Sequence, residues 1–101
     1  MRARTKYSPR ATRQLEDLYD YVARDSNPER AQTFVGSIIE YCDRLATSPY
    51  RGTKRDDLRP GLRIVGFKRR VTIAFSVTDE AVVILGVSYR GRSFKALLKD
   101  E

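Results

Sequence analysis

The sequence predicts an α+β protein in which an antiparallel helical hairpin packs on one face of a mainly antiparallel four-stranded sheet. Two stretches with apolar residues at helical spacing follow one another in the first half of the chain, and three stretches with strand character follow in the second half. A short candidate strand precedes the helices, so the expected order is β-α-α-β-β-β. Helices grouped together and strands grouped together are typical of an α+β layer arrangement.

Residues 2–7 form the short candidate strand, and Ser8-Pro9 marks the start of the first helix. The Ser8 hydroxyl can accept a hydrogen bond from a free backbone N–H group, and proline suits the first turn because its missing N–H has no role there. Apolar residues then recur three and four positions apart, which places them on one helix face. They are Ala11, Leu15, Leu18 and Val22.

A break at residues 25–28 separates this helix from a second one, in which Asn27 can cap and Pro28 can open the first turn. A wide apolar stripe continues for about five turns, until Pro49 excludes further helix. Its members are Ala31, Phe34, Val35, Ile38, Ile39, Cys42, Leu45 and Ala46. The short connection predicts that the two helices form an antiparallel hairpin.

Residues 49–61 combine prolines and glycines with many charged residues, so they are expected to form a long loop that is either functional or mobile. Three strands are predicted after it, at residues 62–67, 71–77 and 81–89, with turns at 68–70 and 78–80. The last strand is almost continuously apolar, which is typical of a central strand covered on both faces. The pattern leaves open which edge receives residues 2–7.

The length of 101 residues fits one domain spanning residues 1–101. There is no histidine and only one cysteine, Cys42, so neither an internal disulfide nor a metal site is expected, and no cofactor motif occurs. No apolar run approaches the roughly 18 residues of a membrane span, and the basic N-terminus is not followed by the apolar stretch of a signal peptide. We therefore expect a cytoplasmic protein without a membrane partner.

Charge is distributed unevenly along the chain, whose formal net charge is +7. Residues 16–43 carry seven acids and two bases, whereas residues 51–70 carry eight bases and two acids. The first fifteen residues add five bases and no acid. Such a basic surface either keeps a protein in solution or attracts nucleic acid, an anionic membrane or an acidic peptide.

Hydrolysis of RNA would require a base for the 2′-hydroxyl, an acid for the leaving oxygen and cations for the phosphate. The cations are available at Arg63, Arg90 and Arg92, but without histidine the one candidate acid at the end of the last strand is Tyr89. A tyrosine at that place is more often a packing residue with its hydroxyl at the rim. The carboxylates of the basic loop, Asp56 and Asp57, are expected to pair with Arg55 or Arg59.

Several short motifs, in their order and spacing, resemble the ParE branch of the RelE/ParE toxin superfamily over nearly the whole chain. The most specific stretch is Arg55-Asp56-Asp57-Leu58-Arg59-Pro60-Gly61-Leu62-Arg63. The others are Tyr7-Ser8-Pro9-Arg10-Ala11, Leu15-Glu16-Asp17-Leu18-Tyr19-Asp20-Tyr21-Val22, Leu45-Ala46-Thr47-Ser48-Pro49 and Ile84-Leu85-Gly86-Val87-Ser88-Tyr89-Arg90-Gly91-Arg92. Many members have histidine near the end of the last strand, where this chain has Tyr89.

The resemblance implies a non-enzymatic toxin of a type II toxin–antitoxin system that inhibits DNA gyrase. It also implies a ParD-like antitoxin, through which alone the complex would contact nucleic acid. We expect Arg59, Arg63, Arg90 and Arg92 to bind the target, provided that the entrance and the exit of the strand meander lie close together. The competing interpretation is that Arg63 pairs with a helix acid and that the C-terminal residues are disordered.

The antitoxin's C-terminal segment is expected to place apolar side chains beside Leu18, Tyr21 and Val22, and carboxylates near the cations of the sheet. An alternative is a ribosome-dependent mRNA endoribonuclease of the RelE type that uses Arg63, Tyr89 and Arg92. A third possibility is a toxin-like partner protein without a live target.

Overall fold

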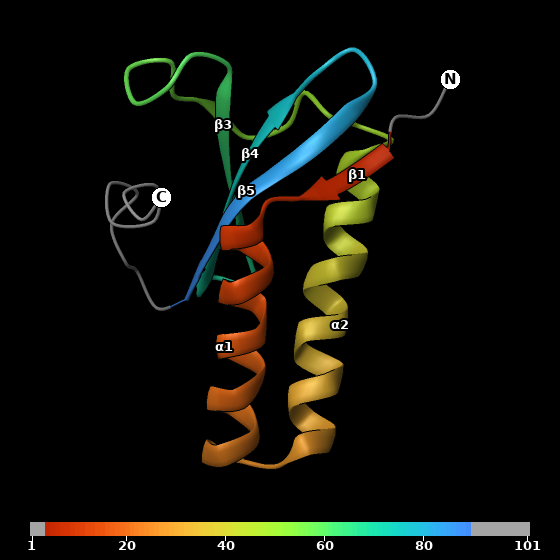
Figure 1. Cartoon of the computed structure of the whole chain (residues 1–101), viewed down its shortest axis with the longest axis vertical. Helices are drawn as coiled ribbons and strands as arrows, with labels where there is room; N and C mark the ends of the chain where they lie inside the picture. The colour runs from red at the N-terminus through yellow and green to blue at the C-terminus, as the bar shows by residue number, and fades with distance from the viewer. Residues whose placement is uncertain (1–3, 90–101) are drawn as a thin grey trace.

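The computed structural model describes residues 4–89 of the chain (Figure 1). Strand β1 (Arg4–Tyr7) is followed by helices α1 (Pro9–Asp25) and α2 (Pro28–Leu45). Four strands complete the described part: β2 (Thr53–Lys54), β3 (Leu62–Phe67), β4 (Val71–Val77) and β5 (Ala81–Tyr89). The α+β class and the expected order of the main elements are confirmed.

The sheet has five strands, not the predicted four, in the order β1-β5-β4-β3-β2. It is mixed, because one of its four strand pairs is parallel. The meander from β2 to β5 is antiparallel, as predicted, but β1 pairs in parallel with β5, with Arg4 opposite Ala81 and Tyr7 opposite Ile84. Hence the first strand joins the edge at β5, which makes this apolar strand central. The sequence left this choice open because β1 is too short to show a pattern.

The additional strand, β2, lies inside the segment expected to be a loop. Thr53 pairs with Ile64 and Lys54 with Arg63 along the edge of β3. Gly52 makes this approach possible: its φ is +78°, and a Cβ there would lie 2.3 Å from the Ile64 carbonyl oxygen. A two-residue strand between charged residues has no alternation that a sequence could reveal.

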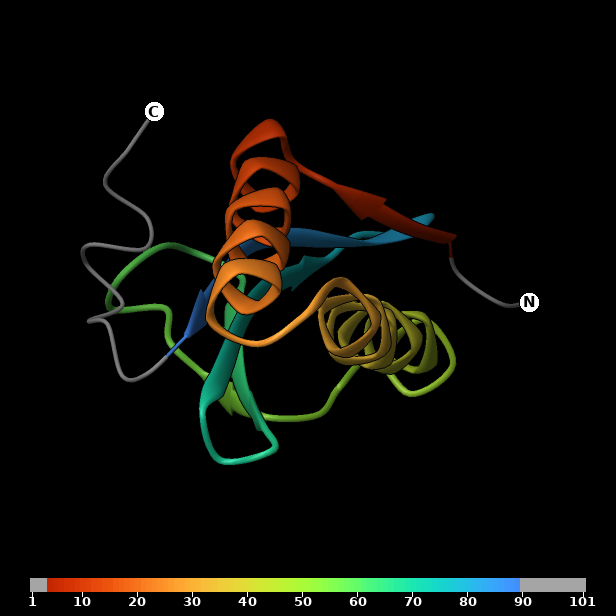
Figure 2. The same ribbon diagram turned by 90° about the horizontal axis from the view of Figure 1, so that it is seen from below.

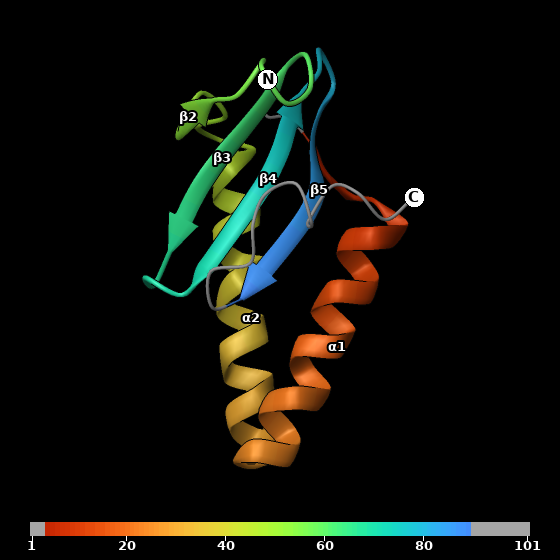
Figure 3. The same ribbon diagram turned by 90° about the vertical axis from the view of Figure 1, so that its left-hand side faces the viewer.

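Both helices begin at the predicted caps. The Ser8 hydroxyl accepts from the Ala11 N–H at 3.0 Å, and the Asn27 side-chain oxygen accepts from the Arg30 N–H at 2.8 Å. The two helices form the predicted hairpin, and Figures 2 and 3 show both of them on the same face of the sheet. No helix within residues 4–89 is long and apolar enough to cross a membrane.

The main core lies between the hairpin and the sheet. Phe75 of β4, Ile38 and Leu45 of α2 and Ile84 of β5 have no exposed surface. Burial of each such side chain contributes roughly 2–3 kcal/mol. A smaller cluster on the opposite face joins Leu62, Ile64 and Ala74 to Leu58 and Leu85. Leu58 therefore anchors the 49–61 segment on the sheet.

Ser8, the N-cap of α1, and the helix itself also form hydrogen bonds with backbone groups of β5. The Ser8 N–H donates to the Ile84 carbonyl at 2.9 Å, and the Ser8 hydroxyl donates to the Leu85 carbonyl at 3.1 Å. One turn further on, the Val87 N–H donates to the Gln14 side-chain oxygen at 2.7 Å. These bonds fix the start of α1 against the end of β5.

The turn between β3 and β4 has an unusual backbone for its sequence. Lys68 and Arg69 both have positive φ, at 52° and 66°. Turns that need positive φ at two successive residues are normally made by Asn-Gly, Asp-Gly or Gly-Gly. For residues with a Cβ, this left-handed conformation costs about 1–2 kcal/mol each.

We expect Gly52→Ala to destabilise the fold by at least about 2 kcal/mol. The new Cβ would collide with the backbone of Ile64, and the alanine would have to adopt a positive φ. Gly36→Ala is the matched control: no atom lies within 4 Å of the Cβ it would add to α2. In that helix, alanine should stabilise by up to about 1 kcal/mol. Urea unfolding of both variants measures the difference, and equal stabilities would contradict the assigned position of β2.

Candidate functional site

Arg63 lies on β3 beside the segment that follows α2. Its Nη1 donates to the Arg51 carbonyl oxygen at 3.2 Å, and its guanidinium lies 5.2 Å from the centre of the Tyr50 ring. Lys54 is directly opposite Arg63 across the β2–β3 pair. Neither Arg63 nor Lys54 contacts a carboxylate within the described residues. The pairing of Arg63 with a helix acid, which was the competing interpretation, is therefore not found among residues 4–89, and two cations lie side by side at this edge.

The carboxylates of Asp56 and Asp57, in the loop before β3, form hydrogen bonds within that loop. Asp57 binds Arg55 through two hydrogen bonds of 2.9 Å, as the sequence suggested, and this pairing lowers the pKa of Asp57. Asp56 instead accepts from the Gly61 N–H at 2.9 Å. An exposed carboxylate whose pKa is lowered is a poor base near neutral pH. Arg59, between them and β3, is half-buried.

Tyr89 has the packing position expected of a tyrosine at the end of a central strand. Its ring centre lies 6.0 Å from Tyr21 of α1 and 5.7 Å from Phe34 of α2. The second pair meets edge to face, an arrangement that aromatic rings prefer. Tyr89 therefore joins the end of β5 to both helices.

The sheet register separates Arg63 from Tyr89. Tyr89 pairs with Val71, and Val71 pairs with Phe67, which is four residues beyond Arg63 on β3. The two residues are thus about 13 Å apart along the strands and about 10 Å apart across them. Strands β3 and β5 run in the same direction because each is antiparallel to β4 (Figure 3).

The entrance and the exit of the meander consequently lie at opposite ends of the sheet. The expected approach of the two ends does not hold for Arg63 and Tyr89. The other two target-binding candidates, Arg90 and Arg92, lie outside the described residues.

Beside the end of β5 stands a different set of cations, which the sequence analysis treated only as a turn. Lys68, Arg69 and Arg70 connect β3 to β4 and directly precede Val71, the partner of Tyr89. All three side chains are exposed and contact no carboxylate in the described part of the chain. The signal that could have revealed them is a cationic tripeptide at a tight turn that contains neither glycine nor asparagine.

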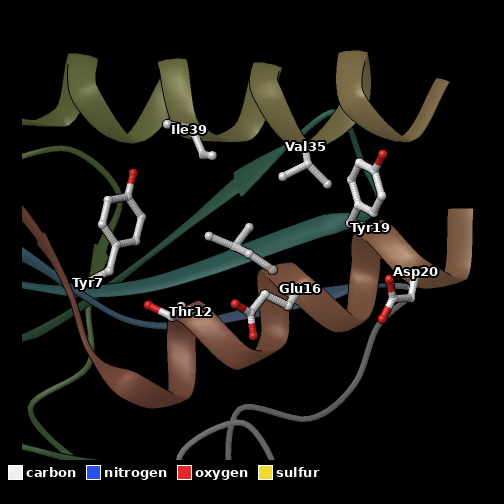
Figure 4. A pocket seen from close by; sticks show the side chains of 8 residues that line it. Tyr7, Thr12, Glu16, Tyr19, Asp20, Val35 and Ile39 are labelled. Carbon is white, nitrogen blue, oxygen red and sulfur yellow. The ribbon is translucent and has the colours of Figure 1, made fainter. Parts of the chain in front are cut away.

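A groove of about 440 Å³ lies between the two helices (Figure 4). Its walls are mainly apolar, with Leu15 and Tyr19 from α1 facing Val35 and Ile39 from α2. The remaining lining residues are Tyr7, Thr12, Glu16 and Asp20. Figure 4 shows the Glu16 and Asp20 carboxylates along the α1 side, so this apolar groove has an acidic rim.

The residues predicted to bind the antitoxin are not the ones that line this groove. Leu18 is 6% exposed and belongs to the core, whereas Tyr21 is 39% exposed and packs on Tyr89. Val22 is half-buried against the same core. The signal for the groove was present in the α2 stripe, which is wider than a single core-facing row because it includes Val35 and Ile39.

At the end of the groove, the hydroxyl of Tyr7 lies beside the thiol of Cys42. Burial, and secondarily the proximity of Cys42, raises the pKa of Tyr7 above its ordinary value. Burial likewise raises the pKa of the Cys42 thiol to about 11. Both groups stay protonated near neutral pH, so neither supplies a nucleophile. Across residues 4–89, histidine, cysteine and acidic side chains nowhere gather in a group of three that could hold a metal ion.

The fold occurs in solved structures of other proteins. A chain from the chromosomal ParDE toxin–antitoxin system of P. aeruginosa has 24% identity and a TM-score of 0.76, over 88% of this chain and 97% of that one. A chain from the RelBE2 toxin–antitoxin complex of Mycobacterium tuberculosis has 19% identity and a TM-score of 0.64, over 89% and 100%. The fold is therefore one found in toxin–antitoxin complexes.

The sequence itself assigns the family. Residues 5–94 match the family described as the ParE toxin of the type II toxin–antitoxin system parDE. The protein belongs to this ParE toxin family, which confirms the resemblance seen in the motifs. No curated protein matches the sequence.

We expect the Cys42 thiol to resist modification in the folded protein. It has no exposed surface and a pKa of about 11, so both access and thiolate are lacking at pH 7.5. Labelling with a thiol-reactive dye should be at least about a hundredfold slower than in guanidinium chloride, where the thiol has its ordinary pKa. Equal rates in the two conditions would mean that β1 and α2 separate readily in the native state.

Proposed function

We propose that this ParE-family toxin acts in the cytoplasm by binding DNA gyrase, without chemistry of its own, and that a ParD-like antitoxin neutralises it. The proposal keeps Arg59, Arg63, Arg90 and Arg92 as target contacts, but not as one patch, because Arg63 lies at the opposite end of the sheet from Tyr89, which Arg90 and Arg92 follow in the sequence. No cofactor or metal takes part. The proposal rests on family membership and on one observation, the separation of Arg63 from Tyr89.

That separation argues against catalysis because general acid–base chemistry needs its groups within hydrogen-bond reach of one substrate. Arg63 and Tyr89 are too far apart to contact one phosphodiester, and the ring of Tyr89 is engaged by Tyr21 and Phe34. Asp57 is held by Arg55 and cannot replace the missing base. Binding through cations requires no such convergence.

A ribosome-dependent endoribonuclease of the RelE type, using Arg63, Tyr89 and Arg92, is the second candidate. It is favoured by the likeness of the fold to a chain of the RelBE2 complex. On the ribosome, additional groups from the target could complete an incomplete site. The two candidates differ in the process that stops first after induction, which is replication for a gyrase inhibitor and translation for an endoribonuclease.

The antitoxin partner fits the groove between the helices. An amphipathic segment that folds on binding could bury apolar side chains against Tyr19, Val35 and Ile39. The acidic rim of Glu16 and Asp20 would select a lysine or arginine at the margin of that segment. Tyr21 and Val22 remain candidate contacts on the other flank of α1, whereas the buried Leu18 can only support them.

For the target, we expect purified toxin to inhibit DNA supercoiling by gyrase and to leave mRNA on translating ribosomes intact. Arg90→Ala/Arg92→Ala should weaken this inhibition at least tenfold by removing two cations. Its thermal stability and antitoxin affinity should stay within the small changes typical of surface substitutions, about 0.5 kcal/mol.

Two results would each contradict a different part of this proposal. Full inhibition by the double variant would remove the C-terminal residues from the mechanism. Cleavage of ribosome-bound mRNA that is lost in both Tyr89→Phe and Arg63→Ala would establish the endoribonuclease instead.

For the antitoxin, we expect Ile39→Glu to reduce affinity at least tenfold, because it places a third carboxylate in an apolar groove that already has two. Ile39 is 39% exposed, so the change should not unfold the protein. Thr33→Glu, on an exposed position of α2 outside the groove, is the charge-matched control. Calorimetric titration of each variant with the antitoxin measures the affinity. A loss of affinity with Tyr21→Ser but not with Ile39→Glu would place the antitoxin on the Tyr21 side of α1 and not in the groove.

A further inference from the structure

We propose that the tip of the β3–β4 hairpin, Lys68-Arg69-Arg70, binds the phosphate backbone of double-stranded DNA directly. This goes beyond the proposed function, in which the toxin contacts a protein target and reaches nucleic acid only through its antitoxin. It does not depend on gyrase being that target.

The tip of the hairpin combines backbone strain with positive charge. Lys68 and Arg69 both occupy the left-handed region, where asparagine or glycine would be less strained. Strained backbone that persists at an exposed position is a reason to look for function there. Here the two strained residues are both cations. We take their positive charge, and not their backbone preference, as the reason for their presence at the tip.

Within residues 4–89, no carboxylate neutralises these cations. Arg69 and Arg70 make no ion pair in the described part of the chain, and Lys68 Nζ lies over the Phe67 ring at 5.5 Å. Three consecutive like charges repel one another, and an external anion would relieve that repulsion. As far as the described residues go, the tip is therefore a cationic surface without a counter-charge.

Contacts between aromatic rings hold the base of this tip in place. The Phe67 ring stacks on Tyr41 of α2 with centres 4.7 Å apart, and the Arg44 guanidinium lies 5.7 Å from the Tyr41 ring. This column ties the base of the hairpin to the second helix. Figures 2 and 3 show the turn projecting beyond the rest of the sheet, so a large partner can reach it.

The geometry favours DNA over an acidic peptide. Duplex DNA carries one negative charge per ~1.7 Å of helix axis. Carboxylates on one face of an extended peptide are instead about 7 Å apart, since alternate side chains point away. Because the duplex carries more charges per unit length than such a peptide, it attracts a cluster of three cations more strongly. A two-stranded β-ribbon also has dimensions that the major groove of B-DNA admits.

The test is binding of a fluorescently labelled 20-base-pair duplex to the purified toxin, followed by anisotropy between 50 and 200 mM KCl. The variant Lys68→Asn/Arg69→Gly removes two cations and installs the residues that this backbone prefers. We expect affinity at 50 mM to fall on the order of tenfold and the slope of log K against log salt to become less negative by about 1.8, which is ~0.9 per lost phosphate contact. The melting temperature should not fall, because the turn becomes less strained.

Two further variants make the outcome unambiguous. Arg24→Gln/Arg30→Gln removes the same charge from exposed positions on α1 and α2, and it should keep the wild-type slope. Arg69→Gln/Arg70→Gln removes charge without introducing glycine, and it should behave like the turn variant.

An unchanged slope in both tip variants would overturn the proposal, as would an equal loss in the Arg24/Arg30 control, which would leave net charge as the cause. A polyglutamate probe that binds the tip while duplex DNA does not would assign the surface to an acidic protein instead.

Discussion

The parallel pairing of β1 with β5 is the constraint on which the rest of the structure depends. It joins the first described strand to the last one and places β5 between two hydrogen-bonded neighbours. Because Ser8 caps α1 and also bonds the Ile84 and Leu85 backbone, the helix begins where β1 ends and must run along β5. The hairpin then covers the one sheet face that carries Phe75 and Ile84.

A second constraint, the antiparallel meander, distributes the cations. Because β4 is antiparallel to both of its neighbours, the start of β3 and the end of β5 must lie at opposite ends of the sheet. Arg63 therefore stands with Lys54 at one end, and the Lys68–Arg70 tip stands beside Tyr89 at the other. Two separate basic surfaces result, with an acidic-rimmed apolar groove on the hairpin between α1 and α2.

The sequence was sufficient for the features that depend on local rules. Ser8-Pro9 and Asn27-Pro28 identified both helix starts, and the apolar alternation of residues 71–77 identified β4. It was insufficient where distant segments decide the outcome. The pairing of Thr53 with Ile64 requires Gly52 to approach a strand twelve residues away, and charged neighbours conceal it. For the candidate site, Tyr89 was correctly weighed as a packing residue, but its distance from Arg63 follows from strand direction, which no local pattern encodes.

The pairing of residues 4–7 with residues 81–84 also has a consequence for synthesis on the ribosome. Contacts between segments this distant in sequence form late, because the loop between them must close before they can contribute. The hairpin has its full apolar stripes by residue 45 but no central strand to cover them until residue 84 has left the exit tunnel. A nascent or truncated chain thus exposes α1 and α2 without the geometry of either basic surface. Under the proposed function, the residues that contact the antitoxin are therefore synthesised before the strand that completes the sheet.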